Sequence, residues 1–444
     1  MTKGYSVGMS QDAPAQIKSL YVHVPFCAQK CEYCAFFSEA SSGELINRYV
    51  AALEREIALV AHDLRPRTIF FGGGTPSILN LRQWESLLGT MRQHDLLGAE
   101  EFTVECNPAT VSLEKAKLLR SLGVNRISMG VQSLDETLLD RLGRVHSREM
   151  VFKSFDTLRQ AGFDNVNIDL MFAIPGQTMD IWRATLDEAL ALGSEHLSSY
   201  EVIYEEDTPL YAQLKAGEFD VDEDLACDMY EELITRSAKA GFRQYEIANF
   251  ARDVRAEKSV PGVRPSPGAA TSAMPDDLKE QSCNSPASIA VAEDGHAPCS
   301  KTRPNDPLVP TFACRHNMNY WRGGDYYGLG PSATGYVRGV RTKNWSNTQL
   351  YCEQLEKGRR AIESSEDLGP LKRAAETAAF GLRMNAGWPF EEFNRATGYD
   401  LRSEWSADMD SLVQRGWALR SPERFQLTHQ GLRFADNAAE MFLR

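Results

Sequence analysis

The sequence has no long apolar run and no excess of basic residues. No stretch approaches the roughly 18 continuous apolar residues that a membrane span needs, and residues 1–16 lack the apolar core of a signal peptide. We therefore expect a cytoplasmic protein without a membrane span. The formal net charge is −13, whereas nucleic-acid binders usually present a basic face to phosphates. DNA and RNA are therefore not expected as partners.

One long segment contains no aromatic residue. Residues 251–311 hold nine of the chain's 20 prolines and are rich in Ser, Ala and Gly. Such a segment buries too little apolar surface to offset the entropy lost on ordering. We predict a flexible insertion here, in which Cys283 and Cys299 are incidental exposed thiols.

Cysteine is sparse and unevenly spread. The chain has nine cysteines, and three of them fall within residues 27–34. Secreted disulfide scaffolds are short and rich in cysteine. An odd number of cysteines in a long chain, with one tight group, instead indicates a metal centre.

The first 250 residues alternate between β-rich runs and helical patterns. Six runs read as strands, and helical patterns lie between them; the strands are Ser19–Val24, Thr68–Phe71, Glu101–Glu105, Asn125–Met129, Val166–Leu170 and His196–Val202, and the helices include Glu44–Ala61, Leu113–Leu122, Arg148–Ala161 and Ile181–Leu192. This alternation predicts an α/β fold with parallel βαβ units. Because six units are too few for a closed eight-stranded barrel, we expect a partial, open (β/α)6 barrel. A doubly wound sheet fits the same pattern.

The predicted domains follow from these changes in pattern. They are an N-terminal tail (1–16), the (β/α)6 domain (17–250), the insertion (251–311), a segment that completes the core (312–344) and a mostly helical C-terminal domain (345–444). The last part reads helix, β-hairpin (Trp417–Leu427), helix, which resembles a winged helix. Residues 388–444 carry seven Arg and nine Asp or Glu, so we favour a structural or docking role over DNA binding.

The strongest chemical signal is a CxxxCxxC motif directly after the first strand. Its cysteines are Cys27, Cys31 and Cys34. Thiolates are the usual ligands of iron–sulfur clusters, and three of them leave one iron of a [4Fe–4S] cubane open to a further ligand. A structural zinc site would need a fourth ligand, for which only His23 is near in sequence. Three inert buried cysteines are the remaining alternative.

A CxxxCxxC loop after the first strand of a β/α fold resembles the radical-SAM superfamily. The resemblance implies that S-adenosylmethionine (SAM) binds the open iron of the cluster through its amino and carboxylate groups. It further implies that the reduced cluster donates an electron to the sulfonium, which yields methionine and a 5′-deoxyadenosyl radical.

Further polar positions fit this resemblance. The sequence Gly72-Gly-Gly-Thr-Pro after the second strand resembles the motif that holds the SAM amino group. Other polar residues stand at the carboxyl ends of successive strands, where β/α folds bind ligands. By resemblance to one branch, SAM contacts, some of them in a second SAM site, are expected from Tyr21, Gly73, Gly74, Thr75, Glu105, Gln132, Arg144 and Asp169. Taken singly, Glu105, Gln132, Arg144 and Asp169 are more typical of capping or solvated residues, and the glycine segment can equally be a tight turn.

That branch comprises oxygen-independent coproporphyrinogen III oxidases and heme chaperones of the HemW type. The oxidase pattern has a fourth cysteine at the position of Phe36 and a longer N-terminal extension, whereas 26 residues precede Cys27 here. The His316-Asn-Met-Asn-Tyr-Trp stretch also resembles the chaperone branch. We therefore favour the chaperone branch over the oxidase, which performs oxidative decarboxylation in porphyrin biosynthesis.

The chaperone resemblance implies three partners. They are heme, an acceptor haemoprotein that is expected to be respiratory, and an electron donor for the cluster. His316 is a candidate heme ligand, since His commonly ligates heme iron, although it can equally be a structural residue that bridges backbone groups. No residue is assigned as catalytic, and whether the protein turns SAM over is left open. A pure interaction protein with a structural cluster is the third alternative.

Overall fold

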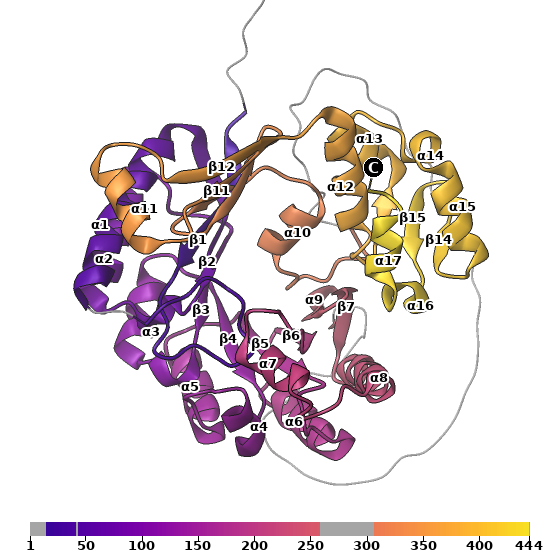
Figure 1. The fold of residues 1–444 in the computed structure, drawn as a ribbon, viewed down its shortest axis with the longest axis horizontal. Helices are drawn as coiled ribbons and strands as arrows, with labels where there is room; N and C mark the ends of the chain where they lie inside the picture. The colour runs from indigo at the N-terminus through magenta and orange to yellow at the C-terminus, as the bar shows by residue number, and fades with distance from the viewer. Residues whose placement is uncertain (1–14, 41–42, 258–305, 444) are drawn as a thin grey trace, which may run out of the picture.

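The computed structural model describes residues 15–40, 43–257 and 306–443 (Figure 1). Its main sheet has nine strands in the order β7-β8-β6-β5-β4-β3-β2-β1-β9. The strands are β1 Ile17–Val24, β2 Leu64–Gly73, β3 Glu101–Cys106, β4 Arg126–Gln132, β5 Val166–Phe172, β6 His196–Glu201, β7 Phe242–Glu246, β8 Asn249–Arg252 and β9 Tyr327–Leu329. All six predicted strands are confirmed.

The six strands β1 to β6 are parallel and lie in their sequence order. A doubly wound sheet would reverse direction at a switch point, and this order has none, so that alternative is wrong. The connecting helices are α1 Gly43–Val60, α2 Leu81–Gln93, α3 Leu113–Ser121, α4 Glu136–Arg141, α5 Arg148–Gln160 and α6 Met179–Ala191. Capping side chains fix where several begin: Ser112, Ser147 and Thr178 each accept a backbone N–H from the first turn. The partial, open (β/α)6 barrel is thus confirmed.

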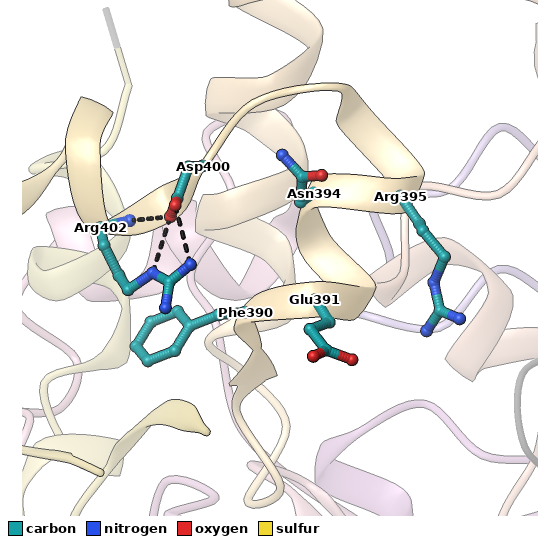
Figure 2. Close-up of a pocket in the computed structure, with 6 residues that line it drawn as sticks. All are labelled: Phe390, Glu391, Asn394, Arg395, Asp400 and Arg402. Atoms are coloured by element: carbon teal, nitrogen blue, oxygen red, sulfur yellow. Dashed lines mark hydrogen bonds and ion pairs between the residues drawn. The ribbon is translucent and has the colours of Figure 1, made fainter. Parts of the chain in front are cut away.

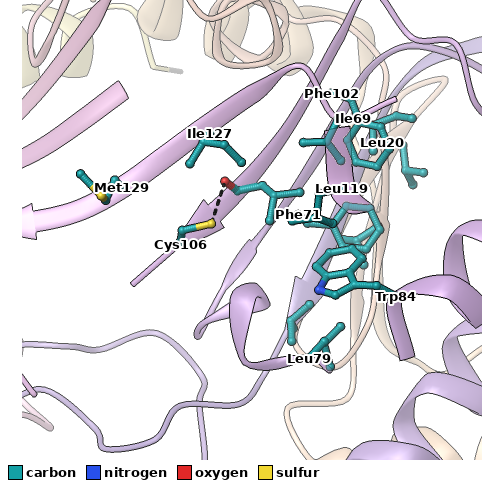
Figure 3. Close-up of a cluster of buried hydrophobic side chains, with 14 of the residues drawn as sticks. Leu20, Ile69, Phe71, Leu79, Trp84, Phe102, Cys106, Leu119, Ile127 and Met129 are labelled. Carbon is teal, nitrogen blue, oxygen red and sulfur yellow. Dashed lines mark hydrogen bonds between the residues drawn. The ribbon is translucent and has the colours of Figure 1, made fainter. Parts of the chain in front are cut away.

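The two faces of this sheet differ in chemistry. Alternate strand residues on the outer face are apolar and pack against the helices; Figure 3 shows Ile69, Phe71, Phe102 and Ile127 of this core with Trp84 from α2. The residues between them, which face inward, are mostly polar. A closed barrel usually fills its interior with branched aliphatic side chains, so this polar interior is suited to a ligand.

The edges of the sheet carry elements that the sequence did not predict. After α7 Pro209–Lys215 and α8 Glu223–Lys239, the β7–β8 hairpin adds antiparallel to β6. Far along the chain, β9 adds parallel to β1. The short helix α10 Arg315–Trp321 lies between the sheet and the C-terminal domain (Figure 1).

Placed elements lie on both sides of two predicted domain boundaries. The span 251–311 begins inside β8 and continues into α9 Val254–Glu257, and residues 306–311 are also placed; Cys283 and Cys299 lie outside the described residues. The C-terminal domain begins after residue 345, because α11 Thr348–Glu356 packs on α1 and β12 Ile362–Asp367 pairs with β11 Val340–Asn344. That three-stranded sheet is completed by β10 Thr334–Val337.

The C-terminal domain starts at α12 and has its own core. Its elements are α12 Pro370–Gly381, β13 Trp388–Pro389, α13 Phe390–Thr397, α14 Leu401–Glu404, α15 Ser406–Gln414, β14 Ala418–Arg420, β15 Arg424–Leu427, α16 His429–Leu432 and α17 Ala435–Glu440. The three strands form one sheet, in the order β13-β15-β14. Helix, strand, helices and hairpin therefore follow one another as in a winged helix, as predicted. Across the described residues, no helix combines the length and apolar character needed to cross a membrane.

Candidate functional site

The three motif cysteines lie on the loop that joins β1 to α1. Two backbone hydrogen bonds close the base of this loop: Glu39 N–H donates to the Pro25 carbonyl at 2.8 Å and Cys27 N–H donates to the Glu39 carbonyl at 3.2 Å. All three thiols are free of disulfides and partly exposed. The loop is therefore a closed unit that presents three thiols at the carboxyl end of β1.

Polar groups from other elements reach the sulfurs. Thr75 Oγ1 donates to Cys27 Sγ at 3.6 Å, and Arg144 Nη1 donates to Cys31 Sγ at 3.3 Å. Burial raises the pKa of Cys34, and the neighbouring Cys31 and Cys27 raise it further. The three thiols are thus close enough to affect one another, and the Arg144 guanidinium lies against one of them, Cys31.

These residues fit an iron–sulfur cluster better than a single metal ion. Within the described residues, no three His, Cys, Asp or Glu side chains converge where one ion could be held. Structural zinc requires four ligands around one point, whereas each thiolate of a cubane bonds a different iron. Arg144 also keeps a buried Nε without a hydrogen-bond partner among the described residues, which leaves it a donor for a bound group.

The glycine segment after β2 runs beside the cysteine loop. Gly74 N–H donates to the Val24 carbonyl at 2.8 Å, and Thr75 N–H donates to the Phe26 carbonyl at 2.7 Å. Gly73 has φ +106, and a Cβ there would lie 2.5 Å from the His23 ring. Only glycine combines this backbone conformation with this close approach.

His23 connects the sheet to the far side of the cysteine loop. Its Nε2 lies 2.8 Å from the Phe37 carbonyl and its Nδ1 lies 3.0 Å from the Tyr21 hydroxyl. Burial lowers the pKa of His23, so the ring is neutral: Nε2–H donates to the carbonyl and Nδ1 accepts from Tyr21. From the sequence, His23 was a candidate only for a zinc ligand. Its role in holding the cysteine loop against the sheet was not predicted.

Two predicted carboxyl groups face the interior of the barrel. Glu105 Oε2 accepts the Gly73 N–H at 3.2 Å; burial and, secondarily, the charge of Asp169 raise the pKa of Glu105 to about 8. Asp169 accepts from Ser128 Oγ at 3.0 Å and from Asn167 Nδ2 at 2.7 Å, while burial raises its pKa. At neutral pH Glu105 is mostly protonated and can donate as well as accept.

A polar cavity of about 200 Å³ collects much of the predicted site. It is lined by Tyr21, Phe70, Glu105, Arg126, Ser128, Asn167, Asp169, Ser198, Tyr200, His316, Asn317 and Tyr320. Arg144 lies outside this lining and binds the Gly130 carbonyl at 2.6 Å and Cys31. Gln132 ends β4 with φ +66, at a bulge in the β4–β5 pairing. The structure thus brings Tyr21, Glu105 and Asp169 to the cavity and Thr75 and Arg144 to the thiols.

His316 lies on α10. Its side chain enters the interior of the barrel away from the cysteine loop, next to Ser19 of β1 and Thr68 of β2. Its Nδ1 lies 3.1 Å from Ser19 Oγ and 3.0 Å from Thr68 Oγ1, and its Nε2 lies 2.7 Å from the Tyr320 hydroxyl. The ring stacks on Phe70, and burial lowers the pKa of His316 to about 3. Since both ring nitrogens are hydrogen-bonded, the geometry favours the structural alternative over a heme ligand.

A larger hollow of about 380 Å³ lies on the C-terminal domain. Figure 2 shows its lining, in which Arg402 pairs with Asp400 at 2.8 Å and stacks over the Phe390 ring. None of its lining residues comes from the barrel or the cysteine loop. The smaller cavity is therefore the better candidate site.

Comparisons with known proteins agree with this geometry. A family model described as the radical SAM superfamily matches residues 21–189. The chain is 31% identical to "Heme chaperone HemW" of Lactococcus lactis, over 96% of this chain and 97% of that protein. It is 30% identical to "Heme chaperone HemW" of Bacillus subtilis, over 96% and 99%.

A solved structure confirms the fold. It is the coproporphyrinogen III oxidase (HemN) of Escherichia coli, described as a radical SAM enzyme, with a TM-score of 0.74 and 22% identity over 97% of this chain and 91% of that one. At this identity the likeness concerns the fold, whereas the curated relatives favour the chaperone branch over the oxidase. The chain therefore belongs to the heme chaperone HemW family of the radical SAM superfamily.

Proposed function

We propose that this protein is a heme chaperone that carries a [4Fe–4S] cluster on Cys27, Cys31 and Cys34, binds SAM beside it, and passes heme to an acceptor haemoprotein. The observation that carries this proposal is the similarity to curated heme chaperones over nearly the whole of both chains. The thiol loop, the glycine segment and the inward-facing carboxyl groups support it. A bound cluster would supply an open iron and an electron for SAM.

Several of the predicted residues have positions that support a role in the site. The backbone of Gly73 and Gly74 lets a ligand approach closely, and Thr75 and Arg144 orient the thiols. Glu105 and Asp169 offer oxygens to ribose hydroxyls or an ammonium group. Tyr21, Gln132, Arg144 and Asp169 are assigned to SAM by resemblance alone.

The mouth of the barrel also offers apolar surface to a porphyrin. Phe36, on the cysteine loop, is 69% exposed, and Ile203, just after β6, is 67% exposed. Large exposed apolar side chains often mark binding surfaces. We infer that heme contacts this rim, that its acceptor is a respiratory haemoprotein, and that a separate electron donor reduces the cluster. We assign the barrel to residues 17–250 and 312–369 and the docking domain to residues 370–444.

Two experiments on anaerobically purified protein test this function. Replacing all three cysteines by Ala should abolish bound iron and sulfide, and titration with heme should give a saturable Soret shift. Unchanged iron content, or a linear response to heme, would contradict the proposal. As a comparison, incubation with coproporphyrinogen, SAM and reductant should give no protoporphyrinogen, since Phe36 replaces the fourth cysteine of the oxidase pattern; robust turnover would favour the oxidase.

A further inference from the structure

Arg126, at the start of β4, is the most deeply buried charge that faces the cavity. Its side chain is 2% exposed and belongs to the cavity lining. Its Nη1 donates to Thr103 Oγ1 at 3.5 Å, at the limit of a hydrogen bond, and its Nε has no partner among the described residues. Among the residues that the structure describes, none of the ion pairs involves Arg126.

A second buried arginine shows how such a group is normally satisfied. Arg322 donates to the Gly387 carbonyl at 2.8 Å, lies 3.6 Å from Glu392, and sits 4.5 Å from the centre of the Trp388 ring. A guanidinium has five N–H donors and stays charged in proteins. Burial of such a charge is unfavourable unless acceptors or an anion offset it. Arg126 has one long hydrogen bond in place of the short hydrogen bond and the nearby carboxylate of Arg322.

Carboxyl groups act on the charge of Arg126 without pairing with it: Glu101 and Asp169 lie close enough to stabilise the guanidinium, but neither forms an ion pair with it among the described residues. Glu105 is mostly protonated at neutral pH because its pKa is raised to about 8. The oxygens of Asp169 already accept hydrogen bonds from Ser128 and Asn167. The side chains of Asn317 and Tyr200 line the same cavity and add hydrogen-bonding groups. The cavity therefore combines a positive charge with polar groups.

We propose that this cavity binds a carboxylate of a ligand, with Arg126 as its charged partner. Guanidinium and carboxylate match in shape and form two parallel hydrogen bonds. The proposal rests on the proposed function, which provides two sources of free carboxylate: the propionates of heme and the amino-acid carboxylate of a second SAM that is not bound to the cluster. A volume of about 200 Å³ lies below the ~300 Å³ at which whole-ligand pockets begin. It therefore accommodates a carboxylate arm, while the rest of the ligand extends toward the thiol loop.

The test compares Arg126→Gln, Arg126→Lys and a control, Arg120→Gln, in anaerobically reconstituted protein. Arg120 lies on α3, outside the cavity, and bonds the Gly162 carbonyl. The probes are heme and its dimethyl ester, read by Soret titration, and SAM and decarboxylated SAM, read by calorimetry. Because a hydrogen bond between charged groups is stronger than one between neutral groups, we expect Arg126→Gln to weaken one carboxylate ligand about 10- to 100-fold, which corresponds to ~1.4–2.8 kcal/mol. Arg126→Lys should lose less, and the control should match wild type.

The probes identify the source of the carboxylate. If heme is weakened and its dimethyl ester is not, the group is a propionate; if SAM is weakened and decarboxylated SAM is not, it is the SAM carboxylate. Either result supports the proposal, and unchanged binding of both ligands to folded Arg126→Gln overturns it. Should that variant not fold, equal affinity of wild type for both members of each pair overturns it. Failure of wild type to bind heme at all contradicts the proposed function instead, and leaves the SAM pair as the test of Arg126.

Discussion

At the scale of single residues, the site depends on a few positions where a backbone segment and a side chain are in close contact. Gly73 lies against the His23 ring, and His23 in turn holds the Phe37 carbonyl of the cysteine loop. Glu105 bonds the Gly73 N–H from the other side. A change at any one of these positions therefore alters the placement of the thiols.

Gly73→Ala should destabilise the protein through both backbone strain and a clash. A positive φ costs a non-glycine residue about 1–3 kcal/mol, and overpacking against His23 adds about 1–3 kcal/mol. Gly123→Ala is the matched control, since Gly123 has φ +101 and nothing within 4 Å of a Cβ. Urea denaturation should show a larger loss for Gly73→Ala, together with weaker SAM binding. Equal losses would show that the contact with His23 is unimportant.

The stability of the protein should depend on the protonation of Glu105. Burial raises its pKa from about 4.5 in the unfolded chain to about 8 in the folded protein, so the folded state binds more protons between these values. The free energy of unfolding therefore falls as pH rises through this window and levels off above pH 8. Glu105→Gln should show a smaller fall between pH 6 and pH 8 in urea titrations. A fall as steep as that of wild type would assign the pH dependence to other groups.

At the scale of elements, the sequence predicts the strands well because their helical connections have clear periodicity and capping residues. It does not predict α10 as the element that fills the barrel, nor the β7–β8 hairpin, because both depend on contacts distant in sequence. Arg126 was missed, although alternating polar residues in β1, β4 and β5 are a usable signal: buried parallel strands are normally apolar on both faces. The cysteines were found by their CxxxCxxC spacing after the first strand, and Glu105 by its place at the carboxyl end of β3.

The α10 helix should owe its position to His316. His316→Phe keeps the stacking on Phe70 but leaves the hydroxyls of Ser19, Thr68 and Tyr320 without this partner. Unsatisfied buried groups cost about 1–3 kcal/mol, so we expect a loss of about 2–4 kcal/mol in unfolding free energy. His429→Phe, at an exposed surface pair with Glu231, should change stability little.

The His316→Phe variant also tests whether His316 is a ligand of the heme iron. Because both ring nitrogens of His316 are engaged within the protein, the Soret maximum of bound heme should be the same in His316→Phe and wild type. A shifted maximum in the folded variant would make His316 a heme ligand after all.

At the scale of the whole molecule, two cores are joined through α10 and its surroundings. The C-terminal domain contacts the barrel where Arg322 reaches Gly387 and Trp388, and where Arg383 lies 3.7 Å from the buried Glu246. The sequence placed its start too early, since α11 has a helical pattern like that of the helices that follow. Only the packing of α11 on α1 assigns it to the barrel.

Replacing residues 258–305 by a short Gly/Ser linker should leave the fold intact. The placed residues on either side bond one another: Phe312 N–H donates to the Arg252 carbonyl at 3.3 Å and Thr311 Oγ1 donates to Asp253 at 2.7 Å. A shorter connection lowers the entropy cost of loop closure, so the melting temperature should stay the same or rise. Asp253→Asn, which weakens the bond from Thr311 and those from Arg255, should lower it. A shortened chain that fails to hold its cluster would show that these residues do more than connect.

The order of the strands has one more consequence. In a ring of strands every edge is hydrogen-bonded, so widening the ring breaks backbone bonds. The sheet described here ends at β7 on one side and at β9 on the other. Its curvature can therefore change without breaking the backbone hydrogen bonds between neighbouring strands. The width of such an arc is therefore set by the side chains packed on its two faces and not by a closed ring of backbone hydrogen bonds.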